Sequence, residues 1–557
     1  MGGSGPLEAA GSSTAPYRGV LEQIRGAFPQ PVSDPVHDAY FVFSILRALD
    51  RVDAMKGEIP LLGRPESLDY EASREARIPD GPSNLEAVTG ELVKVLQGMM
   101  IWGHPSAQVN VVCPPSIPSI IGALLPSIYN PNLVSDDTSQ RVAETEARVA
   151  AMTAALLGYD PQVARGLFTF GGTGTTLYGA RIGLEKACPG SRRHGLRGGA
   201  VVLTSEQSHF CRLNVASWLG IGEDNVIAVP SGIDNDVKIH DLEEAARTAL
   251  RDGRRIACFI ATLGTTDAFG LDDLAAMVDL RDRLVEEFEL DYRPHVHADA
   301  VIGWAWSVFN DYDFEANPLG FRPRTLRALA GACRRIRDLR LADSVGVDFH
   351  KTGFAPYISS LFLARRGEDL EFIGRQREQM PYLFQSGHYH PGTFTLETSR
   401  AGTGVMAALA NLLLLGKDGF RALLGHLVEI AEVLRENLEA HEATTVMNSG
   451  NFGTVTLFRA YPDGVDTWTV KDRERRDPSY RPQLLAHNEY NRKIYRLLHE
   501  EAMAGRGVLI SMTDCYRHTD YGEPMVALKS FILSPFADEE HVELLVTRLL
   551  EAREKVR

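Results

Sequence analysis

The strongest constraint on the fold is an alternation of short apolar runs with helical patterns between residues 167 and 364. Runs that predict strands lie at residues 167–170, 199–204, 226–229, 256–261, 295–300, 344–348 and 359–364. Apolar residues at helical spacing separate them, at 177–187, 212–219, 242–250 and 271–288. Strands that alternate with helices form a parallel or mostly parallel sheet covered on both faces. The sequence therefore predicts an α/β domain.

Outside this alternation, the patterns predict a helical N-terminal segment and a smaller C-terminal domain. Helical spacing recurs at residues 35–55, 85–100, 117–128 and 139–157. The stretch 365–398 is polar and has no period, as is common in functional loops and in loops that reach a second subunit. After it come a long helical region (402–441), short strands (454–458, 508–512 and 527–532) and an amphipathic helix (538–555).

We therefore divide the chain into four parts. Residues 1–15 are rich in Gly, Ser and Ala and are expected to be a disordered tail. Residues 16–118 are expected to form a helical segment that packs on a partner subunit. Residues 119–408 are the large, ligand-binding domain of this division, and residues 409–557 are the small α+β domain.

Composition narrows the class of protein. A net charge of −15 argues against general binding of nucleic acids or anionic membranes, because both require a basic surface. Six cysteines without CxxC spacing argue against a zinc ribbon or a disulfide framework and are typical of a reducing compartment. The most apolar run, 405–415, is too short to span a bilayer. We expect a cytoplasmic protein.

A strand, a Gly/Thr-rich turn and a helix follow one another at residues 167–187. Gly172 and Gly174 allow the backbone to approach a ligand, the Thr173 hydroxyl can donate a hydrogen bond, and the helix N-terminus offers free N–H groups. The turn matches neither the dinucleotide fingerprint nor the P-loop motif. It predicts an anion site, although such a turn taken alone can also be purely structural.

Three other strands end in polar residues of distinct chemistry. His209 can stack flat on an aromatic ring, or it can cap the next helix. Thr262 belongs to a cluster of small hydroxyl residues, which can also be a simple turn. Asp299 ends a strand that is expected to be buried, and a buried carboxylate is costly unless a positive charge pairs with it. A protonated pyridine nitrogen would supply that charge; a helix cap or a local ion pair is the alternative.

The strand at 344–348 leads directly to His350 and Lys351. A lysine at the end of a buried strand is poorly solvated, which is expected to lower the pKa of its amine and leave it free to attack an aldehyde. An exposed lysine after a strand is the alternative. All these groups follow carboxyl ends of strands, where α/β sheets bind ligands. Together they predict pyridoxal 5′-phosphate as the cofactor.

The motifs that contain these residues give the chain a family resemblance. They are Gly-Gly-Thr at 171–173, Ser-x-x-Ser-His at 205–209, Gly-Thr-Thr-Asp at 264–267, His-Ala-Asp-Ala at 297–300, Asp-Phe-His-Lys at 348–351 and Thr-Ser-Arg at 398–400. From about residue 102 to its C-terminus, the chain resembles the group II pyridoxal-phosphate-dependent amino-acid decarboxylases, which include aromatic-amino-acid, glutamate and diaminobutyrate decarboxylases. The resemblance implies fold type I, the aspartate-aminotransferase fold, with a mostly parallel sheet in the large domain and a smaller α+β C-terminal domain.

The resemblance also implies roles for individual residues. Lys351 would form the internal Schiff base with the cofactor, and Asp299 would keep the pyridine nitrogen protonated. His209 would stack on the ring, and Thr262 would approach its 3′-oxygen side. The cofactor phosphate would be held by the turn, at Gly172, Thr173 and Gly174, with His350 beside it.

In this family, a tyrosine on a mobile loop after the lysine protonates the product carbon. By position, Tyr382 is preferred over Tyr389 for that role. The resemblance implies decarboxylation of an L-amino acid to the corresponding amine, in a homodimer with active sites at the subunit interface. A decarboxylation-dependent oxidative deaminase and a carbon–carbon lyase are alternatives on the same cofactor. A catalytically silent scaffold that binds pyridoxal phosphate is the alternative outside enzymes.

Two departures from the family pattern bear on the substrate. Val301, Trp304 and Trp306 replace smaller residues after the His-x-Asp-Ala motif and are expected to reshape the substrate pocket or simply to fill space. An insertion at residues 311–335 could cover the active site. His388 and His390 share one face of an extended segment, but two histidines without a third ligand predict no metal site.

Overall fold

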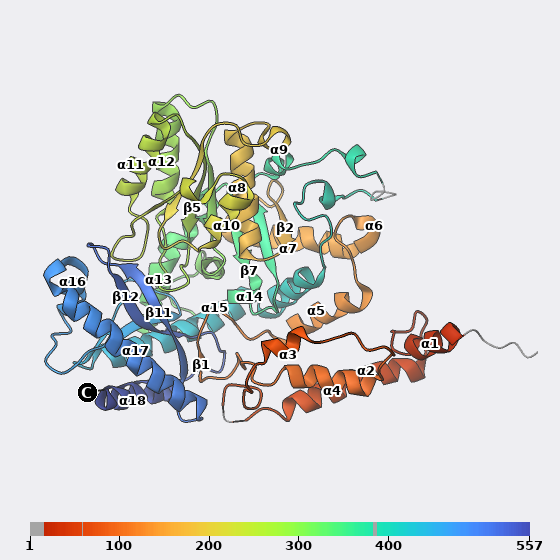
Figure 1. Cartoon of the computed structure of the whole chain (residues 1–557). Coiled ribbons are helices and arrows are strands. Elements are labelled where there is room, and N and C mark those ends of the chain that lie inside the picture. The colour runs from red at the N-terminus through yellow and green to blue at the C-terminus, as the bar shows by residue number, and fades with distance from the viewer. Residues whose placement is uncertain (1–15, 58, 382–386, 557) are drawn as a thin grey trace, which may run out of the picture. The chain divides into compact units, whose positions relative to one another are not determined.

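The computed structural model describes residues 16–57, 59–381 and 387–556 (Figure 1). The chain divides into two compact units, Met1–Ile101 and Trp102–Arg557. The predicted disordered tail, residues 1–15, lies outside the described residues.

The first unit consists of short helices. They are α1 (Pro16–Arg25), α2 (Pro35–Asp53), α3 (Tyr70–Arg74) and α4 (Leu85–Val95). The side chains of Asp34 and Asn84 accept hydrogen bonds from the first free N–H groups of α2 and α4, which explains where these helices begin. No residue of α2, α3 or α4 is buried. The packing of this segment on a partner subunit stays a prediction.

The second unit contains the predicted α/β sheet. Its strands are β2 (Arg165–Thr169), β3 (Ala200–Ser205), β4 (Val226–Val229), β5 (Arg255–Thr262), β6 (His295–Asp299), β7 (Ser344–Asp348) and β8 (Ser360–Ala364). Their order across the sheet is β2-β8-β7-β6-β5-β3-β4. The strands from β3 to β7 pair in parallel, and β8 pairs antiparallel with both β7 and β2. The prediction of a mostly parallel sheet is confirmed.

Helices cover both faces of this sheet (Figure 1). They are α7 (Arg141–Leu157), α8 (Gly172–Ala187), α10 (Cys211–Trp218), α11 (Ile239–Arg251) and α12 (Leu274–Glu287). Helix α8 lies so close to β5 and β6 that a Cβ added at Gly179 would stand 2.6 Å from Nδ1 of His297. Side chains alternate along a strand, so Asp299 faces the same side of the sheet as His297, near the beginning of α8.

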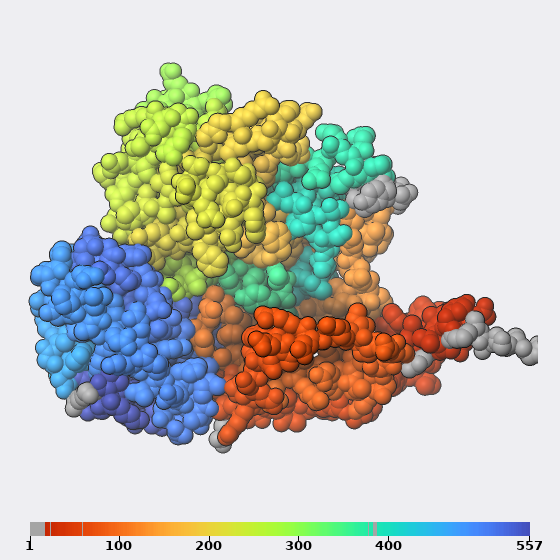
Figure 2. Space-filling model, in the orientation of Figure 1, coloured from red at the N-terminus to blue at the C-terminus, as the bar shows by residue number. Residues whose placement is uncertain are grey.

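The C-terminal residues form the blue lobe of Figure 2 and contain most strands of a second sheet. Helix α15 (Thr403–Glu439) leads into β9 (Thr444–Val446), β10 (Val455–Ala460), α16 (Val470–Arg476), α17 (Arg481–Met503), β11 (Leu509–His518), β12 (Pro524–Phe531) and α18 (Glu539–Lys555). The strand order is β1-β11-β12-β10-β9, in which β1 (Ala107–Gln108) pairs in parallel with β11. Because α15 runs through residue 408, the predicted boundary there falls inside a helix; the domain boundaries stay a prediction.

The remaining helices connect these parts. They are α5 (Ile117–Tyr129), α6 (Asp136–Ser139), α9 (Ser191–His194), α13 (Pro323–Ile336) and α14 (Phe349–Thr352). In the part of the chain that the structure describes, no helix combines the length and the apolar character that crossing a bilayer requires.

Candidate active site

The ends of neighbouring strands bring a lysine and two carboxylates together. Strand β7 ends at Asp348, and Lys351 lies one helical turn later in α14. The amine Nζ of Lys351 forms an ion pair with Oδ2 of Asp348 at 3.1 Å. Asp299 ends the adjacent strand β6, where it pairs with Gly346 of β7, and its charge also acts on Lys351. This cluster lies at the carboxyl edge of the sheet, where ligands bind in folds of this kind.

The expected lowering of the lysine pKa is wrong for this arrangement. Burial acts to lower the pKa of Lys351, but the neighbouring charges of Asp348 and Asp299 outweigh it and raise the pKa above its ordinary value. Desolvation alone would lower the pKa, but Asp348, one helical turn before Lys351, adds a second carboxylate charge. Lys351 is therefore an ammonium at neutral pH in this structure.

The carboxylate of Asp299 contains a hydrogen-bond acceptor to which no described residue donates. Its side chain is buried, and burial raises the pKa of its carboxyl to about 6, against the opposing charge of Lys351. Its Oδ1 atom is shielded from solvent and has no hydrogen-bond partner among the described residues. An N–H group that carries positive charge, such as a protonated pyridine nitrogen, fits this position.

The turn between β2 and α8 offers a place for an anion. Gly171 has φ of 113°, a conformation that side chains disfavour, and α8 begins without any side chain that caps it. A Cβ at Gly172 would lie 3.1 Å from Oδ2 of Asp348 and 3.1 Å from Cγ1 of Val301, so a larger residue would require these side chains to shift. Thr173 and Gly174 complete the first turn of α8. A phosphate fits such an uncapped helix N-terminus.

His209 follows β3 and faces the same cluster. Its Nδ1 accepts a hydrogen bond from the backbone N–H of Cys211 at 3.2 Å, which fixes the ring. Burial, followed by the positive charge of Lys351, lowers the pKa of His209 to about 4. The imidazole is therefore neutral at pH 7, which suits an aromatic surface that stacks on a cationic ring.

Thr262 and His350 flank the cluster. Thr262 pairs with Asp299 across β5 and β6, is buried, and has an Oγ1 atom without a hydrogen-bond partner among the described residues. Its backbone N–H donates to the buried carboxylate of Asp272 at 2.7 Å, which holds the end of β5. His350 lies with Nε2 3.5 Å from Oδ2 of Asp348, and burial lowers its pKa.

Sequence reasoning gave no role to three residues that complete the cluster. Asp348 was only part of a motif, although its spacing of three residues from Lys351 predicts a contact within one helical turn. Ser360 donates a hydrogen bond from Oγ to Oδ1 of Asp348 at 2.5 Å, and only the pairing of β7 with β8 brings them together. The ring of Tyr357 lies 4.0 Å from that of His350, centroid to centroid, and lines a cavity of about 390 Å³ with Glu397 and others.

The two tryptophans fill space in the core. Trp304 and Trp306 are completely buried. Trp304 donates from Nε1 to the backbone oxygen of Asp348 at 3.1 Å and packs on Phe349, while Trp306 packs on Phe269. Of the two expectations, space filling is confirmed. Much of the 311–335 insertion belongs to helix α13, which packs on α15.

Of the two candidate proton donors, Tyr389 belongs to the described residues and Tyr382 does not. Tyr382 lies outside the described residues. Tyr389 is partly buried, and burial, Glu146 and Arg400 are the main influences on its raised pKa, so within one chain it belongs to a different neighbourhood from Lys351. The adjacent His390 offers a nitrogen within 4.8 Å of carboxylate oxygens of Asp136 and Asp137, a grouping that sequence spacing could not reveal. The absence of a metal site stays a prediction.

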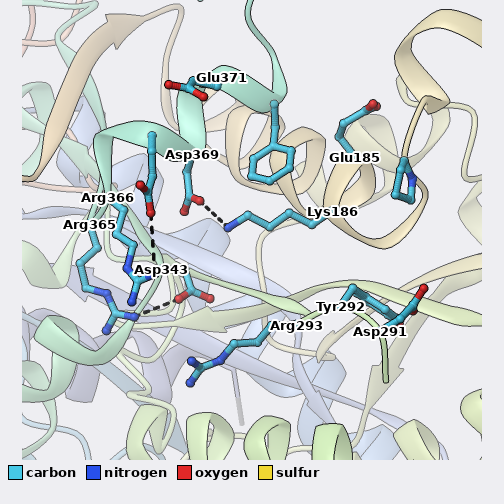
Figure 3. A pocket seen from close by; sticks show the side chains of 13 residues that line it. Glu185, Lys186, Asp291, Tyr292, Arg293, Asp343, Arg365, Arg366, Asp369 and Glu371 are labelled. Atoms are coloured by element: carbon cyan, nitrogen blue, oxygen red, sulfur yellow. Dashed lines mark hydrogen bonds and ion pairs between the residues drawn. The ribbon is translucent and has the colours of Figure 1, made fainter. Parts of the chain in front are cut away.

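A separate cavity of about 760 Å³ lies at the other edge of the sheet (Figure 3). Its charged lining is largely neutralised internally: Lys186 pairs with Asp369 at 2.7 Å, and Arg365 pairs with Asp343 at 3.2 Å (Figure 3). Asp343 precedes the start of β7, whereas Asp348 ends it. The cavity of about 760 Å³ therefore lies at the opposite end of the strands from the lysine cluster. The candidate site is identified by the chemistry of its residues and not by the size of its cavity.

Comparison with known proteins agrees with this geometry. The family described as the pyridoxal-dependent decarboxylase conserved domain matches residues 67–460, more than half of the chain. L-2,4-Diaminobutyrate decarboxylase of Rhizobium meliloti (strain 1021) is 26% identical over 411 residues, which cover 71% of this chain and 74% of that protein.

Two solved structures share the fold. One is the glutamate decarboxylase domain of diaminobutyrate-pyruvate transaminase and L-2,4-diaminobutyrate decarboxylase from Vibrio parahaemolyticus, with a TM-score of 0.70, 18% identity, and coverage of 97% of this chain and 100% of that chain. The other is Oryza sativa TDC with PLP and tryptamine, with a TM-score of 0.73, 17% identity, and coverage of 95% and 99%.

Proposed function

Because this chain belongs to the pyridoxal-dependent decarboxylase family, we propose that it uses pyridoxal 5′-phosphate to remove the α-carboxylate of an L-amino acid, giving the corresponding amine and carbon dioxide. The observation that supports this most directly is the ion pair of Lys351, whose side chain is only 14% exposed, with Asp348, next to the strand end that carries Asp299 and near the uncapped beginning of α8. A reactive amine, an acceptor for a pyridine nitrogen and a phosphate site then lie at one edge of one sheet.

Each residue of the cluster would contact a different part of the cofactor. Lys351 would be the attachment point of its aldehyde, and the backbone N–H groups at Gly172, Thr173 and Gly174 would hold its phosphate, with His350 next to them. Asp299 would accept a hydrogen bond from the ring N–H, His209 would cover one face of the ring, and Thr262 would lie on its oxygen-bearing side. When bound, the cofactor supplies an electron sink that accepts the electrons left by the departing carboxylate.

The protein's share of the catalysis is electrostatic and steric. Asp299, ionised beside the positive charge of the ring, would keep the ring nitrogen protonated. The neutral imidazole of His209 excludes water from one side of the ring without adding a competing charge. We assign the final proton transfer to the segment that contains Tyr382 and Tyr389, with Tyr382 preferred.

A combined labelling and turnover experiment tests this function. The loaded protein is treated with borohydride and digested, and the cofactor label is located by mass spectrometry. Cofactor-loaded protein that has not been treated with borohydride is incubated with a panel of proteinogenic and non-proteinogenic L-amino acids. The amounts of carbon dioxide, amine, aldehyde and hydrogen peroxide are then measured. We expect the label on Lys351 and equal amounts of carbon dioxide and amine. A label on another lysine contradicts the site, and peroxide with aldehyde contradicts simple decarboxylation.

We also propose that the protein is a cytoplasmic homodimer. All six cysteines are free thiols, which suits a reducing compartment. Several large apolar side chains of α5 are exposed, including Ile117, Ile121 and Leu125. Helix α15, against which α5 packs, adds the exposed Leu413 and Leu414. Exposed apolar surface of this kind supports a partner subunit at this face.

A further inference from the structure

Two basic side chains in the C-terminal part of the chain lie near each other without an acidic partner. Arg517 belongs to β11 and is 6% exposed, and Lys471 belongs to α16 and is partly exposed. Among the described residues, neither forms an ion pair with a carboxylate. Burying a charge without a counter-charge destabilises a protein, so a pair of this kind requires an explanation.

The guanidinium of Arg517 uses only part of its hydrogen-bonding capacity. Nη2 donates to the backbone oxygen of Gly232 at 3.3 Å and Nη1 to that of Ile233 at 3.5 Å, and both distances are long for such bonds. Nε is shielded from solvent and has no partner among the described residues. An unpaired buried N–H group can mark the place of a bound ion. The Nε edge of a guanidinium matches the oxygens of a carboxylate or a phosphate.

The amine of Lys471 is also weakly bound. Its Nζ donates to the backbone oxygen of Val446 in β9 at 3.5 Å, the limit for a hydrogen bond. Burial, followed by the positive charge of Arg517, lowers the pKa of this amine to about 8. The two cations therefore repel each other, and an anion that contacts both would relieve the repulsion.

The carboxylates nearby do not neutralise the pair. Asp472 pairs with Arg475 at 3.2 Å, and Oδ1 of Asp234 lies against the open side of Gly450. Asp472 and Asp234 act to raise the pKa of Lys471 and Arg475 acts to lower it, yet that pKa remains below its ordinary value. Positive charge is thus left in excess at this place.

Arg517 connects the second sheet with a loop of the α/β domain, residues 231–237. Beyond the two backbone oxygens that bind Arg517, this loop contributes the N–H of Val237, which donates to the buried carboxylate of Asp272 at 2.7 Å. The same carboxylate accepts from the backbone N–H of Thr262 at 2.7 Å. A ligand on Arg517 would therefore act on a loop that is tied to the end of β5.

We propose that Lys471 and Arg517 form a binding site for a small oxyanion, the phosphate or carboxylate group of a metabolite, which neutralises both cations and fixes the loop at residues 231–237 to the second sheet. Nε of Arg517 and Nζ of Lys471 donate to the anion, and entry is from the partly exposed side of Lys471. The site is separate from the lysine cluster at Lys351, so this inference does not rest on the proposed function.

The test measures the response of the full chain to simple anions. Cofactor-loaded protein is used, because the turn at the beginning of α8 is then already filled. The melting temperature is measured at pH 7 with inorganic phosphate, acetate or chloride at equal ionic strength, and deuterium exchange of residues 231–237 is followed in the same solutions. We expect phosphate to raise the melting temperature and to slow exchange in this loop, and chloride to do neither. A response to acetate as well assigns the site to carboxylates in general, and a response to phosphate alone assigns it to phosphate esters.

Removing either cation should weaken this response. Arg517→Met and Lys471→Met should each need about tenfold more phosphate or more for the same effect, as expected for the loss of a charge-assisted hydrogen bond. In chloride, Arg517→Met should be no less stable than the unchanged protein, because it removes an uncompensated buried charge. Arg476→Gln removes an exposed cation of the same helix and is the matched control that should keep the full response. Lys471→Met, at a partly exposed position, decides the question if Arg517→Met does not fold.

Asp234→Asn tests whether a carboxylate of the chain itself serves the two cations. Under the proposal, this variant binds phosphate several-fold more tightly, because a repelling charge is removed. A lower melting temperature with an unchanged phosphate response would show that Asp234 already neutralises the pair, and would overturn the inference.

The inference also fails if phosphate and chloride act alike on the unchanged protein, or if Arg517→Met and Lys471→Met both keep the full phosphate response. Failure of the proposed function looks different. In that case, Lys351 carries no cofactor label, while the difference between the unchanged protein and the Arg517 and Lys471 variants persists.

Discussion

At the scale of single residues, the site depends on charges that compensate one another. Lys351 is largely shielded from solvent but remains an ammonium, because the charges of Asp348 and Asp299 outweigh the effect of desolvation on its pKa. Asp299 is buried and has one oxygen without a hydrogen-bond partner among the described residues. A buried oxygen without a hydrogen-bond donor destabilises the ligand-free protein, and a ligand that donates a hydrogen bond to it would explain its presence.

Removing the lysine amine should abolish covalent attachment of the cofactor while leaving noncovalent binding of the cofactor in place. Lys351→Ala is expected to lose the borohydride-stable label and turnover above background, because no other described amine lies in the cluster. The cofactor should still bind, more weakly, through the turn and Asp299. Equilibrium dialysis of pyridoxal 5′-phosphate measures this, with Lys186→Ala at the opposite edge of the sheet as the control that should keep the label. Loss of all binding by Lys351→Ala would contradict an anchor at the turn.

The carboxyl of Asp299 should make the cofactor-free protein less stable as the pH rises. Its pKa is raised from 3.8 to about 6, so the folded state binds this proton more tightly than the unfolded chain does. The stabilisation is complete below about pH 4 and is lost as the pH rises through about 6, at a cost of about 3 kcal/mol.

Urea unfolding at pH 4.5 and pH 7 measures this effect. Asp299→Asn should show a smaller loss of unfolding free energy over that range than the unchanged protein, and other carboxyl groups contribute equally to both. An identical loss in the two proteins would show that Asp299 does not titrate as its burial implies.

At the scale of elements, a buried ion pair holds β2 in register with the rest of the site. Both terminal guanidinium nitrogens of Arg400, Nη1 and Nη2, donate to the carboxylate of Glu146 on α7. Arg400 also donates to the backbone oxygen of Phe168 at 2.9 Å, and the Phe168 N–H donates to Glu146 at 2.8 Å. Phe168 precedes the Gly/Thr turn, so the pair positions the start of α8.

Breaking this pair on one side should be costly. Arg400→Met leaves the carboxylate of Glu146 buried without a counter-charge, and we expect a loss of about 3–5 kcal/mol in the free energy of unfolding. The double variant Glu146→Gln with Arg400→Met should recover part of it, since no uncompensated charge remains. Chemical denaturation of the three proteins gives the values. A double variant no more stable than Arg400→Met would mean that the backbone contacts of Arg400, and not the charge pair, carry the effect.

At the scale of the whole molecule, the exposed apolar surface of α5 is the basis of the proposed dimer. Helix α5 buries Ser119, Gly122 and Pro126 against the rest of the unit and exposes apolar side chains elsewhere. A net charge of −15 keeps the remaining surface soluble but does nothing to cover this patch.

Charged residues on this patch should therefore dissociate a dimer. Ile121→Glu with Leu125→Glu is expected to shift the mass measured by light scattering from twice the chain mass towards 61.3 kDa. The control Arg496→Glu changes an exposed residue of α17, outside the patch, and should leave the dimer intact. A monomer in the unchanged protein, active at the same concentration, would contradict the proposal.

The sequence by itself determined the order of the strands along the chain and the chemistry at their ends, because both follow from local periodicity and residue type. It located Lys351, Asp299, His209, Thr262 and the Gly/Thr turn correctly at one edge of a mostly parallel sheet. Only the tertiary structure decided the protonation of Lys351, the role of Asp348, the hydrogen bond from Ser360 and the burial of Trp304. Each of these depends on distances between side chains from different elements, and electrostatic energies and packing follow those distances, not separation along the chain.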